Sequence, residues 1–155
     1  MTPKPDRSPK ARAVDFPGLH VVGRSRRYTA ATRAGIPDLW GAVMDELGEH
    51  MYGEETFGIC HAADGEEFGY LVGFADKGQN LPDGLDHVKL PAGRYAVFDH
   101  EGHISAISET WAGIFDKGLD AAGLKPGRGP EFERYSAAFR PDRPGGVSIW
   151  IPVKS

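Results

Sequence analysis

The chain has 155 residues, of which 40% are hydrophobic and 26% are charged, a balance that suits one globular domain with a sizeable core. Its net charge of −4 at pH 7 gives the whole chain no electrostatic footprint for direct binding of nucleic acid. A single cysteine excludes an intramolecular disulfide and favours a reducing, cytoplasmic location, and no apolar stretch approaches the ~18 residues of a membrane span.

The chain begins with a segment, residues 1–15, that is rich in Pro, Lys and Arg and has few apolar side chains. Ordering such a segment would bury little apolar surface, so we expect a mobile N-terminal arm. Residues 16–155 are expected to form one domain. After the turn Phe16-Pro17-Gly18, the first strand is predicted over Leu19–Tyr28, with two valines at its centre.

A helix follows, because apolar side chains recur every three or four positions over Ile36–His50. Pro37 suits a first helical turn, and Asp38 complements the helix dipole. Strands are predicted over Thr56–His61 and Phe68–Phe74, with an Asp-Gly turn between them. The next segment, rich in Gly, Asn and Pro, is expected to connect the two halves of the chain.

The second half repeats this order of elements. A strand is predicted over Tyr95–Asp99, and an amphipathic helix over Ile104–Ala122. After a Gly/Pro-rich loop, strands are predicted over Phe132–Phe139 and Val147–Val153. The chain therefore reads as strand-helix-strand-strand, twice.

The repeat extends to individual side chains, because Trp40 of the first helix matches Trp111 of the second. We predict an α+β fold of two pseudo-twofold modules, residues 16–80 and 88–155, in which each antiparallel sheet buries one face under its own helix. The modules would meet along a seam, and a cleft at such a seam is a common place for a ligand.

Several segments, in this order and spacing, resemble the GyrI-like family. These are gyrase-inhibitor-like small-molecule-binding domains, which also serve as effector-binding domains of AraC- and MerR-type multidrug regulators. The resemblance covers nearly all of the ordered chain. The segments that carry it are Leu19-His20-Val21-Val22-Gly23, Phe57-Gly58-Ile59-Cys60, Leu90-Pro91-Ala92-Gly93-Arg94-Tyr95-Ala96-Val97-Phe98-Asp99-His100-Glu101-Gly102, Phe132-Glu133-Arg134-Tyr135 and Ile149-Trp150-Ile151-Pro152-Val153.

Glu133 is the most informative residue of this set. An acid is a poor strand residue, so Glu133 either lies on a solvated face or points into an apolar cavity, where it is costly unless a cation pairs with it. The resemblance implies the second alternative: an aromatic-lined pocket in which the Glu of a Phe-Glu-x-Tyr strand contacts lipophilic, cationic ligands. Aromatic faces would add cation–π attraction of roughly 0.5–2 kcal/mol each.

Strand alternation places Glu133 and Tyr135 on one face of their strand. In the last strand we assign the Ile/Val face to the helix-packed core, which puts Trp150 on the pocket face with Glu133. Core packing remains an alternative role for the other aromatic residues. The predicted ligand-binding residues are Glu133, Tyr135, Trp40, Trp111, Phe115, Trp150, Tyr95 and Phe98.

The function expected from this pattern is a stand-alone protein that binds lipophilic, cationic aromatic small molecules. The segment before the domain is too short for the helix-turn-helix that the regulators carry. Some stand-alone members of the family hydrolyse cyclopropane-bearing electrophilic toxins, so the first alternative is a hydrolase with Glu133 as general base and Tyr135 as proton donor. The second alternative is a protein-interaction module, with a regulator or gyrase as partner.

Other chemistry finds little support in the sequence. No histidine or cysteine pair has zinc-ligand spacing: His100 and His103 lie near a turn, and His61 and His87 are isolated. Cys60 is read as a small buried apolar residue rather than a nucleophile. The glycines form no phosphate-binding loop. We therefore expect neither a metal nor a cofactor.

Overall fold

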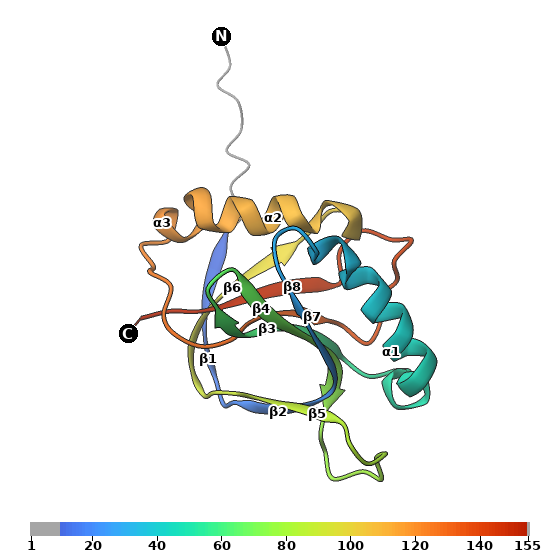
Figure 1. Cartoon of the computed structure of the whole chain (residues 1–155). Coiled ribbons are helices and arrows are strands. Elements are labelled where there is room, and N and C mark those ends of the chain that lie inside the picture. Colours follow the sequence, from blue (N-terminus) through green and yellow to red (C-terminus); the bar gives the residue numbers. More distant parts are fainter. Residues whose placement is uncertain (1–9, 155) are drawn as a thin grey trace.

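The computed structural model describes residues 10–154, which form one curved antiparallel sheet with helices on one face (Figure 1). The strand order is β1-β6-β8-β7-β3-β4-β2-β5. The strands are β1 (Ala11–Phe16), β2 (Leu19–Tyr28), β3 (Thr56–Asp64), β4 (Glu67–Ala75), β5 (Asp86–Leu90), β6 (Gly93–His100), β7 (Glu131–Tyr135) and β8 (Val147–Pro152).

Two helical stretches cover the sheet. The first is α1 (Ile36–Met51), preceded by the 3₁₀ turn η1 (Arg33–Gly35). The second runs without a break through a 3₁₀ turn, an α-helix, a π-helical turn and a last α-helical turn. These are η2 (Ile104–Ala106), α2 (Ile107–Gly113), η3 (Ile114–Gly118) and α3 (Leu119–Ala121). No helix in residues 10–154 is long and apolar enough to cross a membrane.

The predicted α+β class and the strand-helix-strand-strand repeat are confirmed. The first repeat is β2-α1-β3-β4 and the second is β6-α2-β7-β8. The two repeats share a single sheet, because β3 of the first pairs with β7 of the second. In that pairing Gly58 lies opposite Glu133, so the junction between the repeats runs past the candidate acid.

The predicted N-terminal arm is wrong for Ala11–Asp15, which belong to β1 and pair with β6; residues 1–9 lie outside the described residues. The end of the predicted connection between the halves runs into β5, a strand that was not predicted and that pairs with β2. Both strands are ordered mainly by backbone pairing with a distant strand, which composition does not reveal. The strand that precedes each repeat therefore pairs with the other repeat: β1 with β6 of the second, and β5 with β2 of the first.

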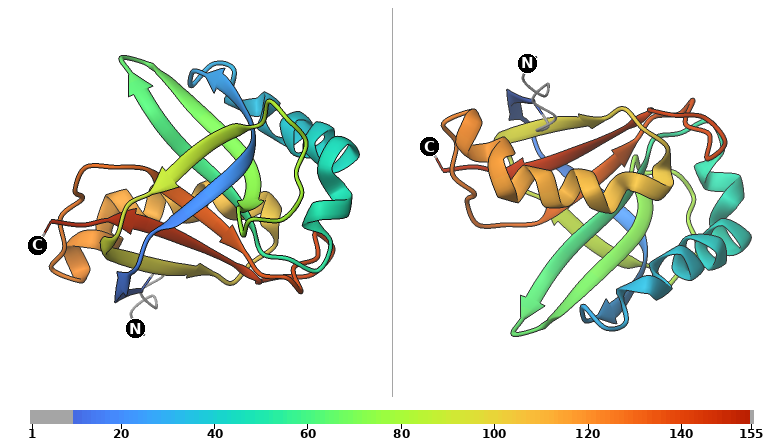
Figure 2. Two further views of the ribbon diagram at one scale, coloured as in Figure 1. Left: turned by 90° about the horizontal axis from the view of Figure 1, so that it is seen from below. Right: turned by 90° about the horizontal axis from the view of Figure 1, so that it is seen from above.

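Both helical stretches lie on the same face of the sheet (Figure 2). Beneath them are two separate clusters of buried side chains. α1 packs Leu39, Val43 and Leu47 onto β2 and β4. The second helical stretch packs Ile114 and Leu119 onto β6 and β8. The two helices thus flank the central strands β3 and β7, where Glu133 lies.

The opposite face of the sheet closes around a third, aromatic cluster. Phe16, at the end of β1, contacts three of its rings: the centroid distances are 5.4 Å to Tyr95, 5.9 Å to Phe132 and 5.3 Å to Trp150. Rings at these separations pack edge-on or tilted, which stabilises them beyond simple burial. Phe16 therefore fixes β1 to the core of the second repeat.

We predict that Phe16→Ala lowers the free energy of unfolding by about 3–5 kcal/mol, because a large buried ring is replaced by a cavity. Urea denaturation followed by circular dichroism measures the change. Tyr52, an aromatic side chain that is 87% exposed, is the control, and Tyr52→Ala should change stability by no more than about 0.5 kcal/mol. Equal effects of the two substitutions would contradict the role of Phe16 in holding β1.

Candidate functional site

Glu133 occupies the middle of β7 and is only 7% exposed. Its neighbours across the sheet are Gly58 of β3 and Ile149 of β8. Directly paired residues of antiparallel strands point to the same side, and Ile149 packs in the cluster beneath the second helical stretch. The carboxylate therefore points toward the helices, in the seam between their two clusters.

Three neutral side chains donate hydrogen bonds to this carboxylate. Its Oε1 accepts from the hydroxyl of Tyr70 at 2.6 Å and from that of Tyr135 at 3.0 Å. Its Oε2 accepts from Nε1 of Trp111 at 2.8 Å. Trp40 donates in turn to the hydroxyl of Tyr70, at 3.2 Å. These bonds offset part of the cost of removing the carboxylate from water.

None of the ion pairs between residues 10–154 involves Glu133. The carboxylates that do pair with Arg or Lys lie near the surface, as Glu55 does with Arg134. Glu133 is thus a buried acid whose partners in this part of the chain are all neutral donors. A buried carboxylate of this kind has unused capacity to attract a cation.

A glycine makes this arrangement possible. Tyr70 lies on β4, and β3 runs between β4 and β7. A Cβ at Gly58 of β3 would lie 1.9 Å from the Tyr70 hydroxyl oxygen and 3.0 Å from Oε1 of Glu133. Only the absence of a side chain at position 58 lets the phenol cross the strand and reach the carboxylate.

Aromatic side chains from both helices surround the acid. Trp40 of α1 packs edge-on against Tyr135, with 4.8 Å between ring centroids. Trp111 of α2 stacks with Phe115, with 6.4 Å between centroids and 10° between ring planes. Phe115 is 49% exposed and lies on the π-helical turn, a feature often found at functional sites. The side of the site next to α2 therefore opens toward solvent.

The predicted orientation of Trp150 is wrong. Trp150 pairs with Phe132 and shares the aromatic cluster on the far face of the sheet, away from Glu133. Tyr95 belongs to the same far cluster, and its hydroxyl donates to the Pro91 carbonyl. Side chains along β8 alternate between the two faces as predicted. Only the register of β8 with β7 shows that Glu133 shares a face with Ile149 and not with Trp150.

Phe98 lies on the helix-covered face, but it is fully buried in the core beneath the second helical stretch. The remaining predicted residues, Trp40, Trp111, Tyr135 and Phe115, are brought together at the seam. Tyr70 was not predicted. Its contact with Glu133 spans 63 positions of sequence, and only the adjacent glycine in the Phe57-Gly58 pair hints at a close approach.

Burial changes the acidity of the groups around the site. It raises the pKa of Tyr70 well above its usual value, and the negative charge of Glu133 raises it further. Burial likewise raises the pKa of Tyr135, with Glu133 again contributing. Burial also raises the pKa of the Cys60 thiol to about 12, so this cysteine stays protonated and is a poor nucleophile at neutral pH.

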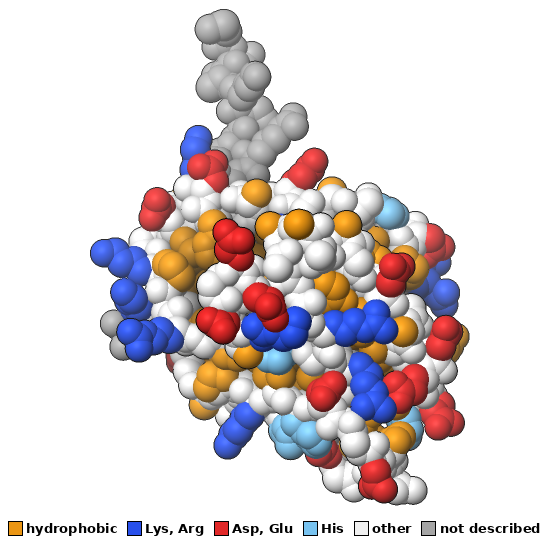
Figure 3. All heavy atoms as spheres, viewed as in Figure 1, with side chains coloured by type: hydrophobic (Ala, Val, Ile, Leu, Met, Phe, Trp, Pro, Cys, Tyr) orange, Lys and Arg blue, Asp and Glu red, His pale blue; other side chains and the backbone are white. Residues whose placement is uncertain are grey.

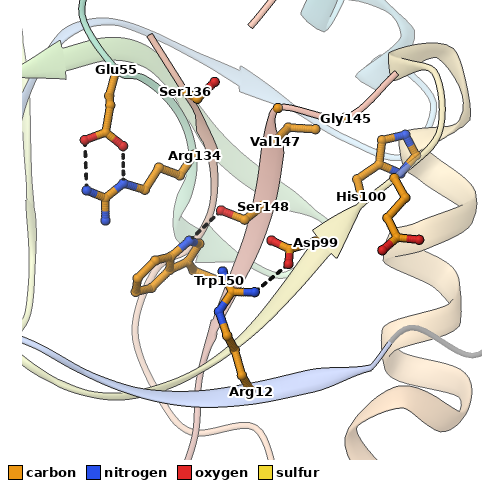
Figure 4. Close-up of a pocket in the computed structure, with 12 residues that line it drawn as sticks. Arg12, Glu55, Asp99, His100, Arg134, Ser136, Gly145, Val147, Ser148 and Trp150 are labelled. Carbon is orange, nitrogen blue, oxygen red and sulfur yellow. Dashed lines mark hydrogen bonds and ion pairs between the residues drawn. The ribbon is translucent and has the colours of Figure 1, made fainter. Parts of the chain in front are cut away.

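A pocket of about 560 Å³ lies away from Glu133, on the other side of the sheet (Figure 4). Four of its charged side chains pair with one another: Arg12 with Asp99, and Arg134 with Glu55. The Arg134 guanidinium also lies 5.3 Å from the ring centroid of Trp150. Both arginines of this pocket are therefore already paired, and Glu101 lines it as a further acid.

Comparisons with known proteins agree with this fold. Residues 10–154 match the model of the GyrI-like small molecule binding domain. Over 153 residues the sequence is 33% identical to the transcriptional regulator BrlR of Pseudomonas aeruginosa. That match covers 95% of this chain and 56% of BrlR, so the chain spans about half the length of this relative.

Two solved structures share the fold. One is SAV2435 bound to tetraphenylphosphonium, with a TM-score of 0.77, 17% identity and 94% of each chain covered. The other is the integron cassette protein VCH_CASS2 of Vibrio cholerae, with a TM-score of 0.72, 18% identity and coverage of 94% of this chain and 96% of that one. At these identities the likeness shows the fold alone.

The tyrosines at the site predict how stability depends on pH. Their pKa values are raised in the folded chain, so Tyr70 and Tyr135 keep their protons at a pH where tyrosines of the unfolded chain ionise. Stability should be full below about pH 10 and should fall above it, by about 1.4 kcal/mol per pH unit for each tyrosine. Urea denaturation at pH 9, 10 and 11 measures this slope.

Removing the Tyr135 hydroxyl tests whether this residue contributes to the loss of stability at high pH. Tyr135→Phe should reduce the alkaline slope, while Tyr70 and Tyr95, whose pKa values burial also raises, should maintain the rest. A Tyr135→Phe variant with the full slope of the wild type would show that Tyr135 does not contribute to it.

Proposed function

The chain belongs to the GyrI-like small molecule binding domain family, and from this we propose that it binds lipophilic aromatic cations, with Glu133 as the charge partner. The observation that carries the proposal is the buried carboxylate, which forms no ion pair within residues 10–154. At 4 Å and an effective dielectric constant of about 20, a ligand cation would interact with it by about 4 kcal/mol before desolvation is counted.

The surroundings of Glu133 suit a large apolar ligand better than a small hydrated ion. Indole and phenol rings from both helices and two strands provide faces for stacking and for cation–π contact. Rings attract cations without requiring a fixed direction for each bond. We therefore expect broad specificity, governed by charge, size and apolar surface.

A ligand would reach Glu133 by displacing Trp111. This indole donates to Oε2 and is only partly buried, and it stacks on the half-exposed Phe115. The Nε1–Oε2 hydrogen bond then holds the site closed until a cation replaces it. Tyr70 and Tyr135 would go on donating to Oε1 and keep the carboxylate oriented.

A related fold supports the class of ligand. SAV2435 has been solved with tetraphenylphosphonium, a permanent cation enclosed by four phenyl groups. The transfer to this chain is part of our proposal and rests on its own buried acid and aromatic side chains. The ligand class is thus defined as bulky, apolar and positively charged.

Hydrolysis by the same site is the second candidate, favoured by the 3.0 Å contact between the Tyr135 hydroxyl and Glu133. A general base needs a free lone pair to take a proton from water. Here three donors use most of the roughly four lone-pair positions of the carboxylate and leave about one on Oε2. Proton abstraction would have to use that one position, whereas attraction of a cation needs only the charge, so the arrangement suits binding better.

The remaining alternative, a protein-interaction module, has less support. Acidic and basic side chains are interspersed over the face shown in Figure 3 and do not form a concentrated patch of one sign. Such a surface gives no obvious electrostatic complement to a DNA-binding protein. We keep the proposal to ligand recognition by residues 10–154.

We predict that tetraphenylphosphonium binds the wild-type chain saturably and that Glu133→Gln weakens binding at least about tenfold, because a full charge interaction is lost while the shape is kept. Isothermal titration calorimetry measures both affinities, and a rhodamine dye provides an independent fluorescence reading. Glu55→Gln is the matched control, since Glu55 is a surface acid paired with Arg134; it should leave affinity unchanged.

An uncharged analogue, triphenylphosphine oxide, separates charge from apolar burial and should bind much more weakly than the cation. Equal binding of tetraphenylphosphonium by wild type and Glu133→Gln would refute the role of Glu133. Consumption of a cyclopropane electrophile by the wild type, lost in Glu133→Gln, would instead support the hydrolase.

A further inference from the structure

Three potential metal ligands converge at the edge of the sheet opposite β1. They are His20 of β2, Asp76 just after β4 and His87 of β5, and one donor atom from each lies within 4.8 Å of the other two. His87 was predicted to be isolated, and that prediction is wrong. The cluster takes no part in the Glu133 site and needs its own explanation.

The fold brings these residues together because β2 pairs with β4 on one side and with β5 on the other. His87 lies directly opposite Val22, two residues after His20, so both imidazoles are on the same face of the β2–β5 pair. The chain leaves β4 at Asp76, whose backbone N–H donates to the His20 carbonyl at 2.9 Å. Backbone pairing therefore fixes all three positions.

The side chains already point toward one another. Nδ1 of His87 lies 3.0 Å from Nε2 of His20, close enough to share one proton. Oδ2 of Asp76 lies 3.8 Å from Nδ1 of His20. The other carboxylate oxygen of Asp76 accepts from the Gly78 N–H at 3.0 Å, which orients the group from behind, as an outer-shell partner does in metal sites.

We propose that His20, Asp76 and His87 bind a divalent late transition ion, zinc above all. Two imidazoles and one carboxylate are a ligand set that suits zinc, whereas magnesium and calcium prefer oxygen ligands throughout. Ligands at about 2.0–2.1 Å in a tetrahedron are roughly 3.4 Å apart, so donor atoms within 4.8 Å need only small side-chain rotations. The ion would replace the direct contact between Nδ1 of His87 and Nε2 of His20.

This site has three protein ligands, which leaves one position for water or for an outside donor. The bound ion would tie β5, the edge strand, to β2 and to the end of β4. Lys89, opposite His20 on β5, is exposed and free to extend away from the ion. Metal binding would therefore stabilise the edge of the first repeat without involving the seam between the helices.

Equilibrium dialysis of the full chain without a histidine tag against zinc tests the proposal. The wild type should bind one zinc per chain, and His20→Gln, His87→Gln and Asp76→Asn should each weaken binding at least about tenfold. His103→Gln is the control, because His103 precedes η2 in the second repeat and should not affect zinc binding. Cobalt absorption in the visible range reports the coordination geometry independently.

Thermal unfolding gives a second reading. Zinc at about a hundred times its dissociation constant should raise the Tm of the wild type by about 5–10 °C, and that rise should be lost in His87→Gln. His87 is exposed, so its replacement should leave the circular dichroism spectrum unchanged. Zinc bound equally by wild type and His87→Gln, or no zinc bound at all, would overturn the proposal.

Discussion

The side chains at the centre of this fold are arranged around the charge of Glu133. An ionised carboxylate inside a protein is strongly destabilising unless it is hydrogen-bonded and paired. This chain meets the first condition with two phenols and an indole, and it meets the second nowhere in residues 10–154. The acids that do form ion pairs with Arg or Lys lie near the surface. The charge of Glu133, which has no counterion among residues 10–154, thus lies between the two helices, beside strands that carry aromatic side chains.

The duplication explains why there is one such site and not two. Aligning the repeats matches Phe57-Gly58 with Phe132-Glu133, and in the sheet Gly58 and Glu133 lie directly opposite each other. A second carboxylate at position 58 would face the first at close range and would also collide with the Tyr70 hydroxyl. One repeat therefore provides the acid and the other provides the space beside it. The matching tryptophans, Trp40 and Trp111, have diverged in the same way, because one donates to Tyr70 and the other to Glu133.

The two faces of the sheet have different tasks. The far face is sealed by a cluster of rings that includes Phe16 from the leading strand, and it anchors the shared sheet. The helix-covered face has two separate cores with the acid between them, and each helix provides one tryptophan to the surroundings of the acid. In the proposed mode of binding, a ligand that enters between α1 and α2 would move Trp111 without disturbing the far-face core.

Local periodicity and a short motif are enough to predict the α+β class, the order of the repeated elements, both helices and the identity of Glu133 as the unusual residue. They also place Tyr135, Trp40 and Trp111 among the candidates. Which residues share a face with Glu133 depends instead on the folded chain: the register of β7 with β8 excludes Trp150, and the absence of a side chain at Gly58 admits Tyr70. Pairing between strands that are distant in the sequence also orders Ala11–Asp15 in β1 and brings the imidazoles of His20 and His87 to within hydrogen-bonding distance. The pattern within one strand shows which residues alternate between its two faces, but which distant strand pairs with it, and which faces are buried together, is decided only when the chain packs.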